Sequence, residues 1–296
     1  MKLHAWPMAP AAMAMEIARD GIIVLQSSEL CNSLLASPLS AAGELLGAAP
    51  LHYDVVAVKP VDGQASIVES NRDGRLHTDS YPMMSPDLVV MSCHQQSASG
   101  GESVFVDSWQ VLDAIRCEDP LLYAKLFTVC RAFRFPAYRV YAPTFGINQG
   151  SFVFHHATFP DEGDEVGRHF QQWVERARKL AFRLEPGQVY LIDNHRMLHG
   201  RTRFVGARHL QRLQLWSEKR SPIPGRFFDA AAAALEWRDH AAGHYSDDVR
   251  RRLGLSRVPD GRFAELPCRD HDALLDRALE TLPLPPAGLL DGITGR

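Results

Sequence analysis

Near the start of the chain, the apolar residues are spaced first as in a helix and then as in a strand. Ala9–Arg19 carries apolar side chains at helical spacing, and Gly21–Leu25 is a short apolar run after a glycine break. These patterns predict a helix followed by a strand. The stretch Leu30–Leu46 is rich in alanine and leucine and predicts further helical structure.

From His52 onward, short apolar runs are typical of β-strands. These runs are Val55–Val58, Leu88–Met91, Val104–Val106, Phe152–His156 and Arg208–Ser217. Asp107 and Ser108 offer an N-cap for a helix that ends near Cys117, and Asp164–Lys179 has helical periodicity. Many short strands with a few inserted helices are typical of a double-sheet jelly roll or barrel.

Two changes of pattern mark a turn and a domain boundary. Phe182–Leu184 and Val189–Asp193 flank the turn Glu185-Pro186-Gly187-Gln188, which predicts a β-hairpin. Beyond Arg220 a Pro- and Gly-containing break precedes two helix-like segments, Phe227–Trp237 and Asp272–Leu282. We therefore expect a main domain over residues 1–220 and a C-terminal helical extension over residues 221–296. Such an extension can serve as a lid, a subunit contact or extra packing.

Composition narrows the class of protein. The chain is 46% apolar and 23% charged, which suits a globular enzyme domain with a sizeable core, and its net charge of −3 gives no broad basic field for nucleic acid. No apolar run reaches the roughly 18 residues of a membrane helix, and Met1–Glu16 lacks the pattern of a signal peptide. The five cysteines are odd in number and show no CxxC spacing, so we expect neither a disulfide framework nor a structural zinc site. This favours a reducing cytoplasm.

The most specific polar pattern is His77-Thr78-Asp79. Alternate residues of an extended chain point to the same side, so His77 and Asp79 can converge on one ion. Two imidazoles and one carboxylate leave open positions on the metal, which suits Fe(II) that activates oxygen. Alone, the pair is weak support for a metal site, because a solvated loop gives the same pattern. The second histidine could be His195 or His199, and their spacing does not choose between them.

Four motifs follow one another in order along the chain. They are His77-Thr78-Asp79, Gly100-Gly101-Glu102-Ser103, Asp193–Arg201 and Arg208-His209-Leu210-Gln211-Arg212. As an ordered set they resemble the taurine dioxygenase/γ-butyrobetaine hydroxylase family of oxygenases, over roughly Ile22–Trp216. The resemblance implies a mainly β fold with flanking helices, a double-stranded β-helix (a cupin-like jelly roll). It also implies His77, Asp79 and His199 as the iron ligands.

The same resemblance implies an Fe(II)- and 2-oxoglutarate-dependent dioxygenase. Such an enzyme uses O2 to convert 2-oxoglutarate to succinate and CO2, and it oxidises an unactivated C–H bond. Hydroxylation is the expected outcome, with desaturation, ring formation and epimerisation as alternatives. Asp79 argues against halogenation, because halogenating relatives carry a small residue at this position.

The resemblance also assigns residues to the co-substrate and the substrate. Arg208 matches the family arginine that binds the distal carboxylate of 2-oxoglutarate, and Ser103 matches the hydroxyl that assists it; a guanidinium meets a carboxylate with two parallel hydrogen bonds. Arg212 lies four residues further along the predicted strand and faces the same way as Arg208. We expect Arg212 to contact an anionic group of a small-molecule substrate. Further candidates for substrate contacts are Asn71, Tyr81 and His155 or its neighbour His156.

Two functions of other classes stay open from the sequence. A metal-dependent hydrolase would use the same triad with a general base beside a metal-bound water, but it gives no role to Arg208 and Ser103. A non-catalytic binding protein on the same fold would have no need of a complete triad. Neither a nucleic acid nor a membrane is an expected partner, and a homo-oligomer is left open.

Overall fold

The computed structural model describes eleven stretches of the chain, which together contain all three predicted metal ligands. They are residues 2–58, 71–79, 85–129, 131–134, 139–148, 151–156, 163–217, 224–227, 230, 256–257 and 263–264. Two compact units are distinguished: the first comprises Met1–Asp79, Pro86–Asp107 and Arg178–Lys219, and the second comprises Ser80–Ser85, Ser108–Ala177 and Arg220–Arg296. The boundary predicted at residue 220 stays a prediction, because most of residues 221–296 lie outside the described stretches.

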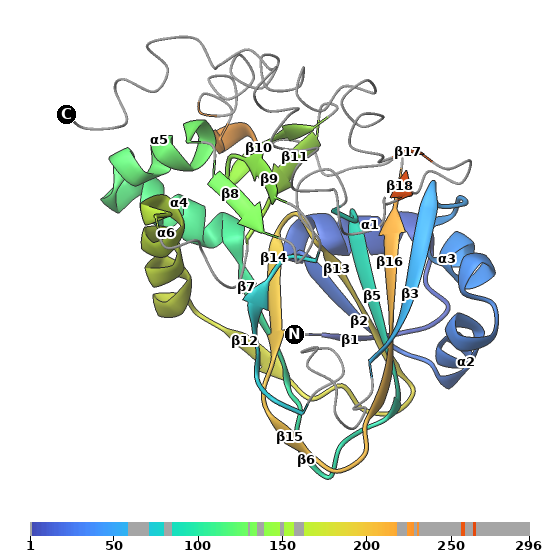
Figure 1. The fold of residues 1–296 in the computed structure, drawn as a ribbon. Helices are drawn as coiled ribbons and strands as arrows, with labels where there is room; N and C mark the ends of the chain where they lie inside the picture. Colours follow the sequence, from blue (N-terminus) through green and yellow to red (C-terminus); the bar gives the residue numbers. More distant parts are fainter. Residues whose placement is uncertain are drawn as a thin grey trace. The chain divides into compact units, whose positions relative to one another are not determined.

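Two facing β-sheets form the first unit (Figure 1). The larger sheet contains, in spatial order, β1 (Leu3–Ala5), β2 (Ile22–Gln26), β13 (Gln188–Asp193), β5 (Leu88–Gln95), β16 (His209–Trp216) and β3 (His52–Val58). The smaller sheet contains β12 (Leu180–Phe182), β7 (Ser103–Asp107), β14 (Met197–Arg201) and β4 (Gly74–His77). Apart from the parallel pair β1–β2, these neighbours run antiparallel. Two facing, mainly antiparallel sheets are the predicted jelly roll. A short ribbon of β6 (Ser99–Gly100) and β15 (Phe204–Val205) lies beside them.

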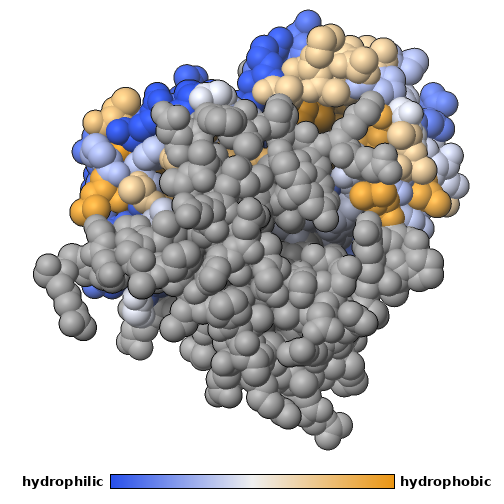
Figure 2. Space-filling model, turned by 90° about the horizontal axis from the view of Figure 1, so that it is seen from above, coloured by the Kyte–Doolittle hydropathy of each residue, from blue (hydrophilic) through white to orange (hydrophobic). Residues whose placement is uncertain are grey.

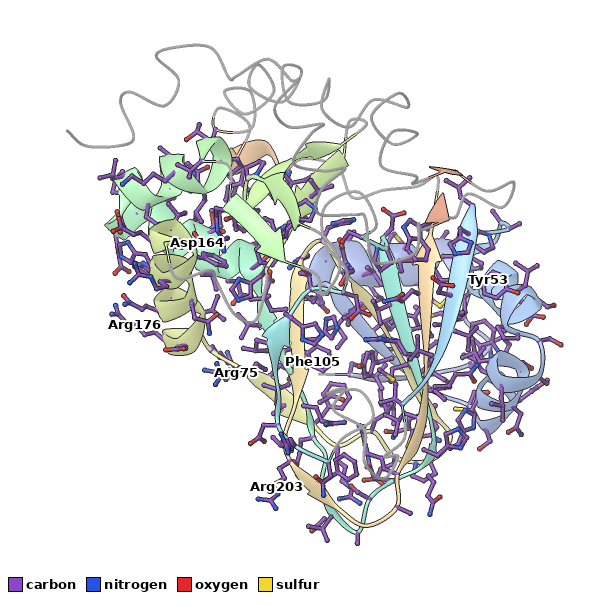
Figure 3. All side chains as sticks on the ribbon, in the orientation of Figure 1. Tyr53, Arg75, Phe105, Asp164, Arg176 and Arg203 are labelled. Atoms are coloured by element: carbon purple, nitrogen blue, oxygen red, sulfur yellow. The ribbon has the colours of Figure 1, made fainter. Side chains whose placement is uncertain are left out.

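Side chains of the larger sheet alternate between two apolar clusters, as the two-residue repeat of a strand requires. On one face, residues such as Leu25 and Leu191 pack against the helices α1 (Pro10–Asp20), α2 (Ser28–Ala36) and α3 (Pro38–Leu46). On the other face Tyr190 meets Phe105 of the smaller sheet edge-to-face, with ring centroids 5.2 Å apart. Figure 3 shows Phe105 pointing into the space between the sheets. The larger sheet is therefore buried on both faces.

The helical stretch predicted over Leu30–Leu46 is two helices rather than one. α2 ends at Ala36 and α3 begins at Pro38. Proline has no N–H for the helical ladder and disfavours helical geometry in the residue before it, here Ser37, which has φ −145° and ψ 67°. The break therefore comes from one proline that the alanine- and leucine-rich composition does not reveal.

The predicted hairpin between Phe182–Leu184 and Val189–Asp193 is wrong. β12 pairs with β7 in the smaller sheet, whereas β13 lies between β2 and β5 in the larger sheet. The turn at Gly187, which has φ +82°, carries the chain from one sheet to the other. β13 is apolar on both faces, as befits a central strand with two neighbours, and a local turn pattern does not specify these partners.

The second unit combines helices with short ribbons. It contains α4 (Ser108–Glu118), α5 (Pro120–Thr128), α6 (Glu165–Arg176), the paired strands β8 (Arg131–Arg134) and β9 (Arg139–Ala142), the paired strands β10 (Phe145–Asn148) and β11 (Ser151–Phe154), the 3-10 turn η1 (Gly225–Phe227), and the paired strands β17 (Ser256–Arg257) and β18 (Phe263–Ala264). Asp164 forms a buried ion pair with Arg131 at 2.8 Å and caps α6 by accepting from the backbone N–H of Gly167. The predicted helix starting at Asp164 is therefore confirmed, whereas the two helix-like segments after Arg226 lie almost entirely outside the described residues.

The surface coloured in Figure 2 alternates between hydrophilic areas and small apolar patches. The exposed large apolar side chains of the described residues are Leu3, Met15, Leu35, Leu39, Val55, Leu121 and Val205. Scattered apolar side chains are ordinary on the surface of a folded protein. None of the described helices combines the length and the apolar character that crossing a membrane requires.

Candidate metal centre

Three side chains of the first unit converge at the edge of the smaller sheet. β14 pairs with β4 so that His199 lies opposite His77, with ring centroids 4.6 Å apart. The Oδ1 atom of Asp79 lies 3.5 Å from Nε2 of His77 and 3.3 Å from Nε2 of His199. One ligand atom from each residue lies within 4.8 Å of the other two, close enough for a shared metal ion. The predicted triad is thus assembled by one strand pair and the loop that follows it.

Gly200 makes this strand pairing possible. A Cβ atom at this position would lie 2.5 Å from the carbonyl oxygen of Gly74 and 3.1 Å from the carbonyl carbon of Arg75. Any larger residue would push β4 away from β14, and His77 away from His199. The close approach of β14 to β4 at this position therefore depends on the absence of a Cβ atom at residue 200.

Both histidines can offer the lone pair of a ring nitrogen to a metal ion. Nδ1 of His77 lies 2.7 Å from the carbonyl oxygen of Arg75, which only accepts, so Nδ1 carries the proton and Nε2 is the free ligand atom. His199 is buried, and burial lowers its pKa, which the nearby Asp79 carboxylate only partly offsets. Neutral imidazole is the metal-binding form, so these residues fit an Fe(II) site.

Asp79 is buried and held from several sides. Nη1 of Arg212 donates to its Oδ1 at 2.8 Å, and Nε2 of Gln214 donates to its Oδ2 at 2.8 Å. The Asn194 side chain accepts from the backbone N–H of Asp79 at 2.8 Å and donates to its carbonyl at 3.0 Å. Burial alone raises the pKa of Asp79, but the charge of Arg212 and the contacts with His199 and His77 outweigh it and hold the pKa well below the usual range. The ligand is therefore an ionised carboxylate.

His195, the rival candidate, lies apart from the triad. Its Nε2 lies 3.6 Å from Oδ1 of Asp87, and its backbone N–H donates to Asp193 at 2.8 Å. It does not belong to the cluster of His77, Asp79 and His199. Of the two histidines, the structure places His199 beside the first ligand pair.

Arg208 is a buried cation inside the same unit. It is 4% exposed, and its hydrogen bonds to Oε1 of Gln96 and the carbonyl of Gly101 are long, 3.3 and 3.4 Å. Among the described residues no carboxylate pairs with it. Burial lowers the pKa of Arg208, which shows that its surroundings disfavour the charge. A buried cation without an acidic partner costs free energy, so this position fits the binding of an anion.

Tyr190 lies near this arginine and hydrogen-bonds to Ser103. Ser103 is buried on β7 and hydrogen-bonds to the side chain of Tyr190, which lies within the electrostatic range of Arg208. Burial raises the pKa of Tyr190 to about 12, so its hydroxyl is neutral. Gly101 has φ +77°, which favours glycine, and a Cβ there would lie only 2.9 Å from Oγ of Ser97. Arg208, Ser103 and Tyr190 thus form a polar group within the core.

Of the described residues predicted to contact the substrate, only Arg212 is seen to contact the triad. Arg212 lies beside Asp79, as described above, but Asn71 is exposed, and its carbonyl accepts from the backbone N–H of Phe204 at 3.2 Å. His155 is buried in the second unit, where its backbone N–H donates to Thr144. Tyr81 lies outside the described residues. Substrate contacts of all four stay predictions.

Three neighbours of the predicted residues were given no role from the sequence. Tyr190 lies in β13, and Asn194 lies in the turn that joins β13 to β14. Gln214 lies two residues after Arg212. Strand alternation places Gln214 on the same face as Arg212, which is the one signal that could have identified it. Nothing local in the sequence shows that its amide reaches Asp79.

The chain matches a known protein family. The model of the family described as taurine catabolism dioxygenase TauD, TfdA family, matches residues 40–214. The γ-butyrobetaine dioxygenase of Pseudomonas sp. (strain AK-1) is 30% identical over 158 residues, which are 46% of this chain and 41% of that protein. The chain thus matches less than half the length of this curated relative.

Solved structures share the fold. An asparagine oxygenase in complex with Fe(II), 2S,3S-3-hydroxyasparagine and succinate gives a TM-score of 0.55 at 19% identity, covering 70% of this chain and 79% of that one. PvcB, an Fe and α-ketoglutarate dependent oxygenase from an isonitrile synthetic pathway, gives 0.52 at 16% identity, covering 73% and 83%. At these identities the likeness shows the double-stranded β-helix fold. Because the family model spans more than half of the chain and includes all four ordered motifs, the chain belongs to the TauD/TfdA family.

Proposed function

We propose that this protein is an Fe(II)- and 2-oxoglutarate-dependent dioxygenase that oxidises a C–H bond of a small molecule. One observation carries the proposal: a cluster of two imidazoles and an ionised carboxylate lies in the same unit as a buried arginine with no acidic partner among the described residues. A metal-dependent hydrolase needs only the cluster. An enzyme that also binds an anionic co-substrate needs both.

The proposed roles follow from the chemistry of each group. His77, Asp79 and His199 hold Fe(II), which when bound supplies the activation of O2 that is coupled to decarboxylation of 2-oxoglutarate to succinate. Arg208 pairs with the distal carboxylate of 2-oxoglutarate, and Ser103 adds a neutral hydroxyl. The family membership and the Fe(II) and succinate named for the similar asparagine oxygenase support these assignments.

The substrate is proposed to carry an anionic group. Arg212 uses Nη1 for Asp79, and its buried Nε has no hydrogen-bond partner among the described residues, which leaves donors for a carboxylate, sulfonate or phosphate. Asn71, Tyr81 and His155 are proposed as further substrate contacts. Hydroxylation is the proposed outcome, with desaturation, ring formation and epimerisation as the alternatives. We place the protein in the cytoplasm on the spacing of its cysteines.

Succinate release from 2-oxoglutarate tests the proposal. The purified protein is incubated with Fe(II), 2-oxoglutarate and O2, together with a panel of small carboxylates and amino acids. We expect succinate that depends on Fe(II) and O2, that rises with one member of the panel, and that is lost in Asp79→Ala. Metal-dependent ester or amide hydrolysis without any succinate would favour the hydrolase instead.

A further inference from the structure

Gln214 lies on the face of β16 that points away from the helices. Its neighbours Leu213 and Leu215 belong to the apolar cluster that packs against α1, α2 and α3. Because successive strand residues point to opposite faces, Gln214 points toward the same side as Arg212, between the two sheets. Its side chain is almost completely buried, so its polar atoms need partners within the protein.

The partner of Gln214 is one specific oxygen of the predicted metal ligand. Nε2 of Gln214 lies 2.8 Å from Oδ2 of Asp79. An ionised carboxylate only accepts hydrogen bonds, so the amide nitrogen and not the amide oxygen must face it. The other oxygen, Oδ1, lies 3.3 Å from Nε2 of His199 and 3.5 Å from Nε2 of His77. The two oxygens of Asp79 therefore have different surroundings.

The rotation of this carboxylate needs a restraint that the backbone does not provide. Asn194 fixes the main chain of Asp79 at both its N–H and its C=O. The carboxylate can still turn about its last side-chain bond, a torsion with a broad, two-fold profile. Arg212 bonds to Oδ1, on the side of the histidines, whereas Gln214 bonds to Oδ2 and holds that oxygen back.

We propose that Gln214 is a positioning residue that makes Asp79 a one-oxygen ligand of the metal. This inference rests on the proposed function, because it assumes that the triad binds a metal ion. Hydrogen bonds to a ligand orient it toward the ion, and their loss typically costs about 10–100-fold in metal affinity. Gln214 thereby sets both the affinity of the site and the number of positions left open for other ligands.

The test compares two glutamines of the same strand. Gln214→Met removes the donor to Asp79 at similar volume. Gln211→Met is the matched control, because Gln211 is equally buried on the opposite face of β16 and donates to the carbonyl of Leu34 at 3.3 Å. Co(II), whose visible spectrum reports its ligand set, is titrated into the wild type and both variants. Only protein that retains the wild-type circular dichroism spectrum is compared.

We expect Gln214→Met to weaken Co(II) binding about 10–100-fold and to change the Co(II) spectrum. Gln211→Met should keep both the wild-type affinity and the wild-type spectrum. If Gln214→Met does not fold, Gln214→Leu replaces it, since that variant also removes the donor to Asp79 and introduces no charge. Wild-type Co(II) binding with no greater loss in the Gln214 variant than in Gln211→Met would overturn this inference alone. Failure of the wild type to bind Co(II) would instead count against the proposed function.

Discussion

Replacing Arg208 by methionine should separate co-substrate binding from stability. Arg208 is 4% exposed and has no acidic partner among the described residues. Removing such a charge relieves a desolvation cost, so the free energy of unfolding should stay the same or rise. Binding of 2-oxoglutarate should fall, because its distal carboxylate loses the buried guanidinium.

The size of the effect follows from the charged hydrogen bonds that are lost. Each contributes about 1.5–3 kcal/mol net, and every 1.4 kcal/mol is roughly a tenfold change in Kd. At a co-substrate concentration of about 100 times Kd, binding stabilises the wild type by about 2.7 kcal/mol, which is roughly 5–10 °C in Tm. If Kd rises about a hundredfold, the same concentration stabilises the variant by only about 0.4 kcal/mol, or roughly 1 °C.

Thermal unfolding with Mn(II), with and without 2-oxoglutarate, measures both quantities at once. Arg203→Met is the control, because Arg203 is an exposed arginine of the neighbouring turn (Figure 3). It should keep the full shift in Tm upon addition of 2-oxoglutarate. An Arg208→Met protein that also keeps this shift, or that unfolds several degrees earlier without ligand, would refute the assignment and make Arg208 a structural residue.

Three further predictions concern the triad, its strand pair and a partly buried histidine. His199→Gln should abolish Co(II) binding in an equilibrium titration, whereas His195→Gln should keep nearly the wild-type affinity, since His195 lies outside the cluster of His77, Asp79 and His199. Gly200→Ala should lower the free energy of unfolding in urea by about 1–3 kcal/mol, because the added Cβ meets the carbonyl of Gly74; an unchanged midpoint would contradict the tight pairing. Burial and then the charge of His209 lower the pKa of His94 below 6.5, so the unfolded chain binds that proton more tightly and stability is lost as the pH falls below 6.5. His94→Gln should therefore lose less Tm than the wild type between about pH 7.5 and about pH 5.5.

The candidate metal ligands could be predicted from the sequence where they lie close together along the chain. His77 and Asp79 are two residues apart, so an extended chain brings them to one side, although β4 itself ends at His77. His199 comes from a strand more than a hundred residues later, and only the ordered family pattern distinguished it from His195. No local sequence pattern identifies β4 as the partner of β14, the strand that carries His199. The pairing depends on the absence of a side chain at Gly200.

The contacts around the ligands could not be predicted for the same physical reason. Gln214 reaches Asp79 because β16 and the loop after β4 meet between the two sheets, and that meeting is a property of the whole jelly roll. The predicted hairpin was wrong for the same reason. The chain does turn after Phe182, but β12 pairs with β7 in one sheet and β13 pairs with β5 in the other. Local patterns specify elements, whereas partners depend on tertiary packing.

The most direct test of the central claim is optical and needs no knowledge of the substrate. Fe(II) and then 2-oxoglutarate are added to the protein without oxygen, and the visible spectrum is recorded. We predict the weak charge-transfer band that the family resemblance leads one to expect of 2-oxoglutarate chelated to iron, and its absence in His199→Gln. Folded wild-type protein that shows no band at saturating Fe(II) and 2-oxoglutarate would contradict the account.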